Sequence, residues 1–229
     1  MIRCTVCGAE NEDLSITCTK CHSYLQAKVD TIDLFSAFWG LIDHPARTLR
    51  KVVLAKQKNY VFILLMLQGI AISLAAISYW QLGKIVPYGL LIGAGFLGGP
   101  LVGILFALIA TLLVKFVTRM LGGHGSARNL RAVLAYGAVP VVFLLVIVYP
   151  LEFGVFGQYL FDHNPPPSTL QPVAYIIFLA LNGLGILWTI VLYGIGCAIA
   201  CSISWWKGMV PAIIVAALAI GGVIAVRWV

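Results

Sequence analysis

Long apolar segments dominate the chain after residue 59. Five of them are long enough to cross a hydrocarbon core of about 30 Å, which takes about 20 helical residues. They are Tyr60–Trp80, Ile85–Val114, Ala132–Phe153, Pro172–Ser204 and Met209–Trp228. The second and fourth are longer than this, so we expect them to tilt or to extend past the interface. The pattern predicts an all-α polytopic membrane protein, with residues 60–229 forming a five-helix transmembrane bundle.

A different pattern precedes the first span, over residues 28–59. A helix through its first part would carry five apolar side chains on one face, and these are Leu34, Phe35, Phe38, Trp39 and Ile42. Such an aromatic face is typical of a helix that lies in the membrane interface. After Pro45 the segment turns basic, and its candidates for contact with an anionic lipid surface are Arg47, Arg50, Lys51, Lys56 and Lys58. The flank of any first span carries similar charges, so both interpretations stay open.

The composition agrees with a membrane protein. Of the 229 residues, 61% are apolar and 10% are charged, whereas charged residues make up about a quarter of a soluble domain. The net charge of +7 is concentrated beside the spans rather than along a separate face. We therefore expect the lipid bilayer and its anionic head groups as partners, and no nucleic acid. The polar N-terminus lacks the basic and apolar regions of a cleavable signal peptide.

Two Cys-x-x-Cys pairs near the N-terminus supply four thiols, and these are Cys4, Cys7, Cys18 and Cys21. Two such pairs joined by a hairpin-sized loop can place four thiolates in a tetrahedron, the geometry of structural zinc. Gly8 and His22 follow the pairs, where a left-handed turn lets backbone N–H groups point at the sulfurs. We predict a zinc ribbon over residues 1–27, with zinc as a structural cofactor. Four protein ligands leave no open position for catalysis.

Two disulfides, or redox chemistry at one pair, are the alternatives to zinc. Disulfides need an oxidising compartment, and a thioredoxin-like motif needs a βαβ context that this sequence lacks. Placing the N-terminus inside puts thirteen of the fifteen Lys and Arg residues in cytoplasmic segments and two outside. We therefore expect a cytoplasmic N-terminus and an external C-terminus, which also keeps the thiols reduced.

Small residues recur every four positions in the second predicted span, at Gly95, Gly99, Gly103 and Ala107. Such a strip lets helices approach closely in lipid, and Pro100 should kink the same helix. We favour packing against the other spans of the chain, while a dimer face or a hinge is the alternative, so a homo-oligomer stays open. Gln68 and Asn182 lie near the middles of their spans and could form hydrogen bonds across the bundle.

Catalytic motifs are missing from the sequence, so we assign no catalytic residues and expect a protein that is not an enzyme. No charged residue or histidine lies deep in a predicted span, which disfavours proton-driven transport. Cys197 and Cys201 stand four residues apart without a third ligand nearby, and we interpret them as small apolar side chains.

From about Phe38 to the C-terminus the chain resembles the Yip domain family, integral membrane proteins named for their interaction with Ypt/Rab GTPases. The resemblance rests on the entry segment 41–50, the loop Leu121–Ser126 and the stretch Leu134–Pro140, in this order. It implies five spans with a cytoplasmic N-terminus, and roles in membrane trafficking, vesicle formation or membrane-protein organisation. The entry segment is similar to that of compact prokaryotic members, which implies a prokaryotic cell (inner) membrane.

Two functions follow from these observations. In the first, the protein is a membrane scaffold or adaptor whose zinc ribbon docks a cytoplasmic protein partner of unknown identity. In the second, the helix bundle itself acts as a transporter, a channel or a lipid-handling protein, with its prolines permitting motion. We favour the first.

Overall fold

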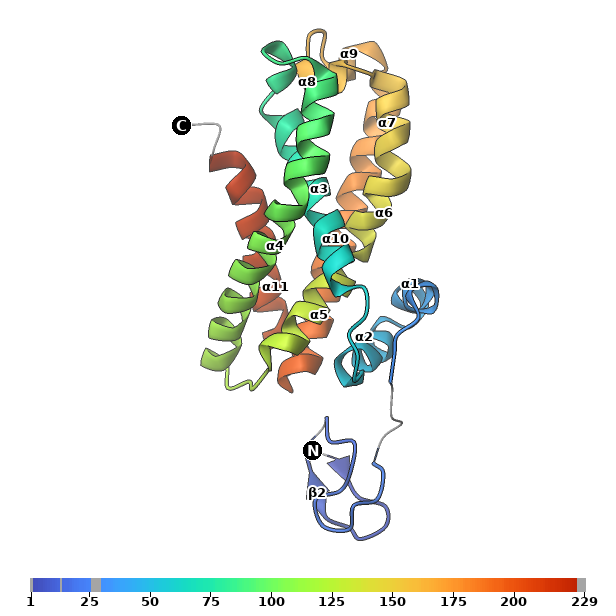
Figure 1. Ribbon diagram of the computed structural model, residues 1–229, viewed down its shortest axis with the longest axis vertical. Coiled ribbons are helices and arrows are strands. Elements are labelled where there is room, and N and C mark those ends of the chain that lie inside the picture. Colours follow the sequence, from blue (N-terminus) through green and yellow to red (C-terminus); the bar gives the residue numbers. More distant parts are fainter. Residues whose placement is uncertain (1, 13, 26–29, 226–229) are drawn as a thin grey trace.

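The computed structural model of the protein describes residues 2–12, 14–25 and 30–225. A helical bundle makes up most of these residues, and a small ribbon lies beyond one end of it (Figure 1). The ribbon pairs two short antiparallel strands, β1 (Ile2–Arg3) and β2 (Glu10–Asn11). We call the end of the bundle nearest to the ribbon the ribbon end, and the opposite end the far end.

Five helical segments of the described chain are long and apolar enough to cross a membrane. The single-helix spans are α3 (Val61–Tyr79), α4 (Tyr88–Met120), α10 (Pro172–Cys201) and α11 (Trp205–Ala225). The third span is a continuous run of α5 (Ala127–Gly137), α6 (Val139–Phe143), the π-helical turn η2 (Leu144–Val148) and α7 (Tyr149–Phe156). The predicted all-α polytopic fold with five spans is confirmed.

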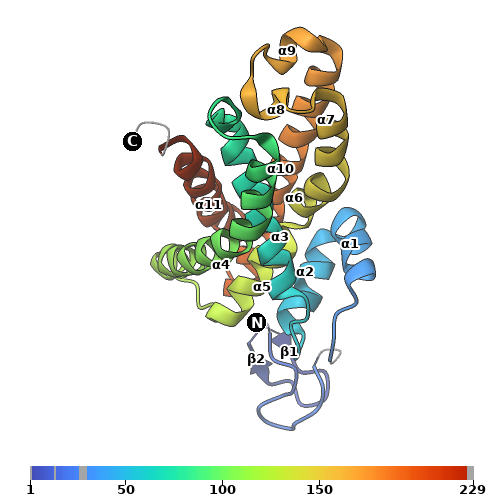
Figure 2. The same cartoon turned by 45° about the horizontal axis from the view of Figure 1, so that its top comes forward.

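Short elements complete the bundle. At the far end lie the 3₁₀ turn η1 (Leu82–Lys84), α8 (Tyr159–Asp162) and α9 (Pro167–Leu170). At the ribbon end, α1 (Leu34–Asp43) and α2 (Pro45–Leu54) lie beside α3 and α5 (Figure 2).

Some helices extend beyond the apolar segments that predict them, whereas α3 and α10 lie within theirs. The second span ends at Met120 rather than Val114, because α4 continues through the charged residues of its last turns. The third begins at Ala127 rather than Ala132, since the Ser126 side chain caps α5 by accepting from Asn129 N. Hydropathy marks the apolar part of a helix, whereas caps set its ends. The predicted end of the fifth span, at Trp228, lies outside the described residues.

Helices α3 and α4 make the closest contact in the bundle. The backbones meet where Gly69 of α3 faces Gly99 and Gly103 of α4, so a Cβ on any of the three would overlap with backbone atoms of the other helix. Pro100 lies inside α4, and the helix bends near its middle (Figure 1). The ribbon-end half of α4 therefore diverges from α3.

Helices α1 and α2 pack into the bundle core at the ribbon end. Leu49 and Val52 of α2 are fully buried, in a cluster that includes Leu41 of α1 and Leu192 of α10. The backbone of α1 approaches α2 closely at Gly40, where any Cβ would overlap with the Thr48 side chain. The corner between the two helices is therefore fixed by packing.

Candidate functional site

The four cysteines of the ribbon form a compact cluster. Their sulfur atoms all lie within 4.8 Å of one another. The Sγ atoms of Cys4 and Cys21 are 3.6 Å apart, and those of Cys7 and Cys18 are 3.5 Å apart. In a tetrahedral zinc site with Zn–S distances of about 2.3 Å, sulfurs lie about 3.8 Å apart. The four thiols therefore fit a tetrahedral metal ion, with Cys4, Cys7, Cys18 and Cys21 as its ligands.

Both turns that follow the cysteine pairs have the left-handed conformation that the sequence predicts. The φ angle is +74° at Gly8 and +56° at His22. The backbone N–H of each of these residues donates back to the first cysteine of its pair, Gly8 to Cys4 O at 2.9 Å and His22 to Cys18 O at 3.0 Å. The two turns are thus related in geometry, although only one carries the glycine that suits it.

Two polar residues beside the sulfurs were not predicted from the sequence. The Ser23 hydroxyl lies 3.2 Å from the Sγ of Cys4 and 3.0 Å from that of Cys21. Asn11 is buried, and its amide donates to the Sγ of Cys18 at 3.6 Å and accepts from Thr19 N at 2.9 Å. Hydrogen bonds to ligand atoms orient a metal site, and these two residues would do so if the cysteines hold an ion.

The hydrogen bonds also act on the acidity of the thiols. The Ser23 hydroxyl, followed by two backbone N–H groups, lowers the pKa of Cys4 to about 6. The pKa of Cys7 is raised to about 12, because contact with Cys21, burial and the other two sulfurs outweigh the lowering by the backbone of Ala9. Thiols this close cannot all ionise without a cation between them, which is the condition that a zinc ion meets.

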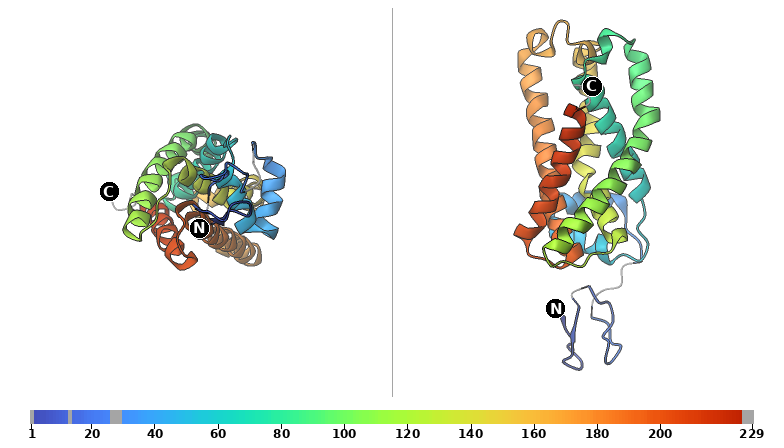
Figure 3. Two further views of the ribbon diagram at one scale, coloured as in Figure 1. Left: turned by 90° about the horizontal axis from the view of Figure 1, so that it is seen from below. Right: turned by 90° about the vertical axis from the view of Figure 1, so that its left-hand side faces the viewer.

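The ribbon presents apolar side chains on both sides of the cluster. Val6, in the first turn, is 72% exposed and Tyr24, after the second pair, is 70% exposed. Leu14 instead packs against a buried cluster of the bundle that includes Val53 and Leu130. Figure 3 shows the ribbon extending beyond the bundle, so the rest of its surface is open.

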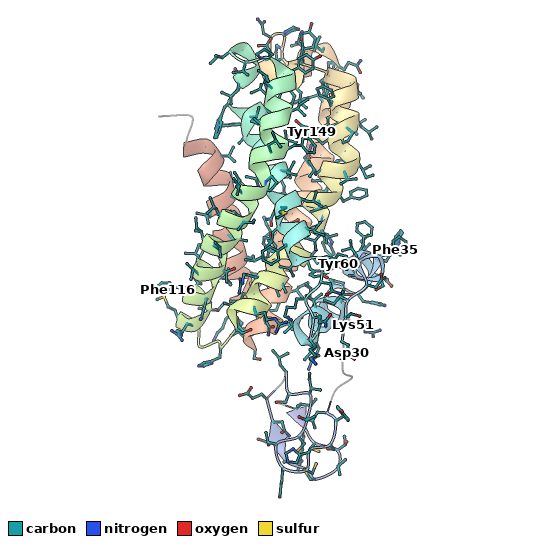
Figure 4. The ribbon with its side chains drawn as sticks, in the orientation of Figure 1. Asp30, Phe35, Lys51, Tyr60, Phe116 and Tyr149 are labelled. Carbon is teal, nitrogen blue, oxygen red and sulfur yellow. The ribbon has the colours of Figure 1, made fainter. Side chains whose placement is uncertain are left out.

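The predicted lipid-contacting residues lie on α2 and in the turn after it. Arg47, Arg50, Lys51 and Lys56 are exposed, and Figure 4 shows Lys51 at the ribbon end of the bundle. Lys58 differs, because its Nζ donates to three carbonyl oxygens, at 2.8 Å to Val52, 2.9 Å to Val53 and 3.3 Å to Ala55. It caps the C-terminus of α2.

The two helices of the predicted interfacial segment differ in what covers them. The apolar face of α2 is covered by α5 and α10, so its exposed face is the basic one. On α1, Phe38 packs on Phe143, while Phe35 and Trp39 are exposed, and Figure 4 shows Phe35 pointing away from the bundle. The uncovered aromatic face therefore belongs to α1.

The four small residues of the predicted packing strip on α4 all face the bundle. Gly95, Gly99, Gly103 and Ala107 are buried. A Cβ on Gly95 would overlap with the Leu74 side chain, and Gly99 and Gly103 contact the α3 backbone directly. The partner residue Gly69 was not predicted, because it is a single glycine without a repeat.

Polar side chains inside the bundle join the spans. Gln68 Nε2 donates to the Tyr193 hydroxyl at 2.8 Å, linking α3 to α10. Asn182 Nδ2 donates to Glu152 Oε1, linking α10 to α7. Cys197 and Cys201 are buried in an apolar cluster. Of the described residues, only the four ribbon cysteines bring three or more potential ligands together.

The fold defines a multi-pass membrane protein with five apolar helices, and it carries a small ribbon whose four cysteines could hold a metal ion. A model of the Yip1 domain matches residues 39–226, and the chain belongs to the Yip1 domain family. The match begins within α1 and leaves the ribbon outside. Neither a curated protein nor a solved structure matches the chain.

Proposed function

We propose that the protein is a non-enzymatic membrane scaffold, and that its ribbon binds zinc and docks a cytoplasmic protein partner. In this proposal residues 1–27 form the docking module, residues 28–59 hold it at the membrane surface, and residues 60–229 anchor it. The family resemblance favours a role in membrane organisation or vesicle trafficking.

The observation that carries the proposal is the closed cysteine cluster on a projecting ribbon. Four thiols that fit one ion leave no position for a substrate, so the metal would stabilise a fold rather than perform chemistry. Val6 and Tyr24 are exposed on that fold. Apolar and aromatic side chains on a rigid surface are typical of protein-binding sites.

Transport through the bundle receives less support. Alternating access needs helices that can separate, whereas α3 and α4 touch through their backbones at Gly69, Gly99 and Gly103. The buried polar residues Gln68 and Glu152 each have a hydrogen-bonding partner on another span. These contacts favour a bundle that anchors.

Affinity capture from crosslinked membranes tests the scaffold proposal. We expect the full-length protein to recover cytoplasmic proteins that the C18S variant loses, because the ribbon does not fold without its metal. A V6S/Y24S variant should keep its zinc and also lose those proteins, while the neighbouring T5S change should retain them. Recovery of the same proteins by all four forms would show that the ribbon is only a structural cap.

Thiol labelling of intact cells tests the orientation. Ser168 lies in the far-end connection and His124 in the ribbon-end loop, and both are exposed. With the N-terminus inside, a membrane-impermeant maleimide should label an S168C variant in intact cells and an H124C variant only after permeabilisation. The reverse pattern would contradict the cytoplasmic placement of the ribbon.

A further inference from the structure

A cavity opens at the ribbon end between α3, α4 and α5. Its volume is about 320 Å³, within the range of about 300–1,000 Å³ for small-molecule sites. It lies between α3 and α4, and Arg128 and Arg131 of α5 also line it.

The walls and the mouth of this cavity differ in character. The walls are apolar side chains of the two spans, among them Phe62 and Leu65 of α3 and Leu108 of α4. Three cations complete the lining, Lys58, Arg128 and Arg131, and we call this part of it the mouth.

The salt bridges among residues 2–12, 14–25 and 30–225 do not involve the three cations Lys58, Arg128 and Arg131. Burial, followed by the charge of Arg128, lowers the pKa of Lys58 to about 8. The mouth therefore gathers three positive charges.

The two arginines keep hydrogen-bond donors for a ligand. Arg128 uses Nη2 to bind Lys56 O at 2.7 Å, and Arg131 uses Nε to bind Ala127 O at 3.3 Å. Each guanidinium has five N–H donors, so most remain available in each. Arg128 and Arg131 are three positions apart on α5 and share a face.

The position of the arginines on α5 adds to the positive potential. The helix begins at Ala127, and its first turn contains no acidic residue. Arginine is unfavourable there, because the N-terminus of a helix is itself positive. A bound anion would relieve this repulsion, which gives the arrangement a physical reason.

We propose that this cavity binds one anionic phospholipid, with its phosphate on Arg128 and Arg131 and an acyl chain along Phe62, Leu65 and Leu108. The guanidinium groups match the geometry of phosphate oxygens. Phe62 is 67% exposed and Leu108 is 47% exposed on spans that face lipid, so a chain can enter from the bilayer. The site does not involve the ribbon, and it goes beyond the scaffold function.

Native mass spectrometry of the full-length protein in neutral detergent tests this site. We expect phosphatidylglycerol to bind at least about tenfold more tightly than phosphatidylcholine with the same acyl chains, because only the former is anionic. The R131Q substitution should weaken phosphatidylglycerol binding about tenfold, the effect of one lost charged hydrogen bond. The matched control is R119Q, which removes one positive charge from the ribbon end of α4. This position lies away from the cavity, so the substitution should leave binding unchanged.

A second pair of variants separates a lipid from a free phosphate. L108W should fill the acyl groove and weaken lipid binding, while L105W, on the exposed side of the same helix, should not. Unchanged melting temperatures without lipid would show that the variants are folded. Equal binding of the two lipids, or equal losses in R119Q and R131Q, would overturn the proposal. A third result would also overturn it: glycerol phosphate competes as strongly as the lipid does, and L108W has no effect. The ligand would then be a phosphate alone.

Discussion

The C18S substitution should remove zinc from the protein and unfold the ribbon while the bundle stays inserted. The ribbon has two strands of two residues each, and the sulfur cluster lies at its centre. A core this small cannot offset the conformational entropy of the chain, so the metal must supply the stability. Structural zinc contributes about 10 kcal/mol or more in comparable peptides.

Elemental analysis and limited proteolysis measure this effect. Wild-type protein should contain one zinc per chain and resist cleavage between residues 5 and 25, whereas C18S should contain none and be cut there. The matched control is C197A, which removes a buried cysteine from the bundle and should retain the zinc.

Alkylation under denaturing conditions addresses the disulfide alternative. All six cysteines should react in wild-type protein that was never reduced, once a chelator has removed the metal. Reaction of Cys197 and Cys201 alone would mean that the ribbon holds disulfides, and it would contradict both the zinc site and the cytoplasmic placement.

The ribbon and the spans could be predicted because their signals are local. Four cysteines in two short pairs need only a turn after each pair to converge, and the turns at Gly8 and His22 provide it. A span needs only enough consecutive apolar residues. In both cases the neighbours in space are close neighbours in sequence.

Features that depend on pairing between distant segments could not be predicted. Ser23 and Asn11 approach the sulfurs only after the ribbon closes. Gly69 is one of 23 glycines, and nothing in the sequence shows that it faces Gly99. Such contacts follow from the register of packed elements, which a single sequence does not specify.

The segment before the first span shows the same limit. The sequence predicts an aromatic face for its first part and a basic character after Pro45, without indicating what covers either part. In the structure α5 and α10 cover the face of α2, and the aromatic face of α1 is left exposed. The exposed aromatic face can therefore be located on α1 only after the bundle is built.

The G103A substitution should destabilise the bundle strongly, although it adds a single methyl group. A Cβ at this position would overlap with the carbonyl oxygen of Leu65 and lie 2.9 Å from Gly69 N, so neither helix can yield by moving a side chain. The two helices must separate, which also breaks the contact at Gly99. Overpacking typically costs about 1–3 kcal/mol. Because the added methyl group would meet the backbone of α3 rather than a side chain, we expect a cost at the upper end of that range or above it.

The matched control lies on the same helix, at Gly98, where an added Cβ meets no atom within 4 Å. Alanine is the better helix former, so G98A should keep the melting temperature in detergent or raise it. The gain in the free energy of unfolding should be at most about 1 kcal/mol. G103A should lower it and reduce the folded fraction in size-exclusion chromatography. Equal melting temperatures for the two variants would contradict the backbone contact between α3 and α4. Because Gly103 also marks the point where α4 leaves α3, a destabilised G103A protein should lose phosphatidylglycerol binding as well, whereas G98A should retain it.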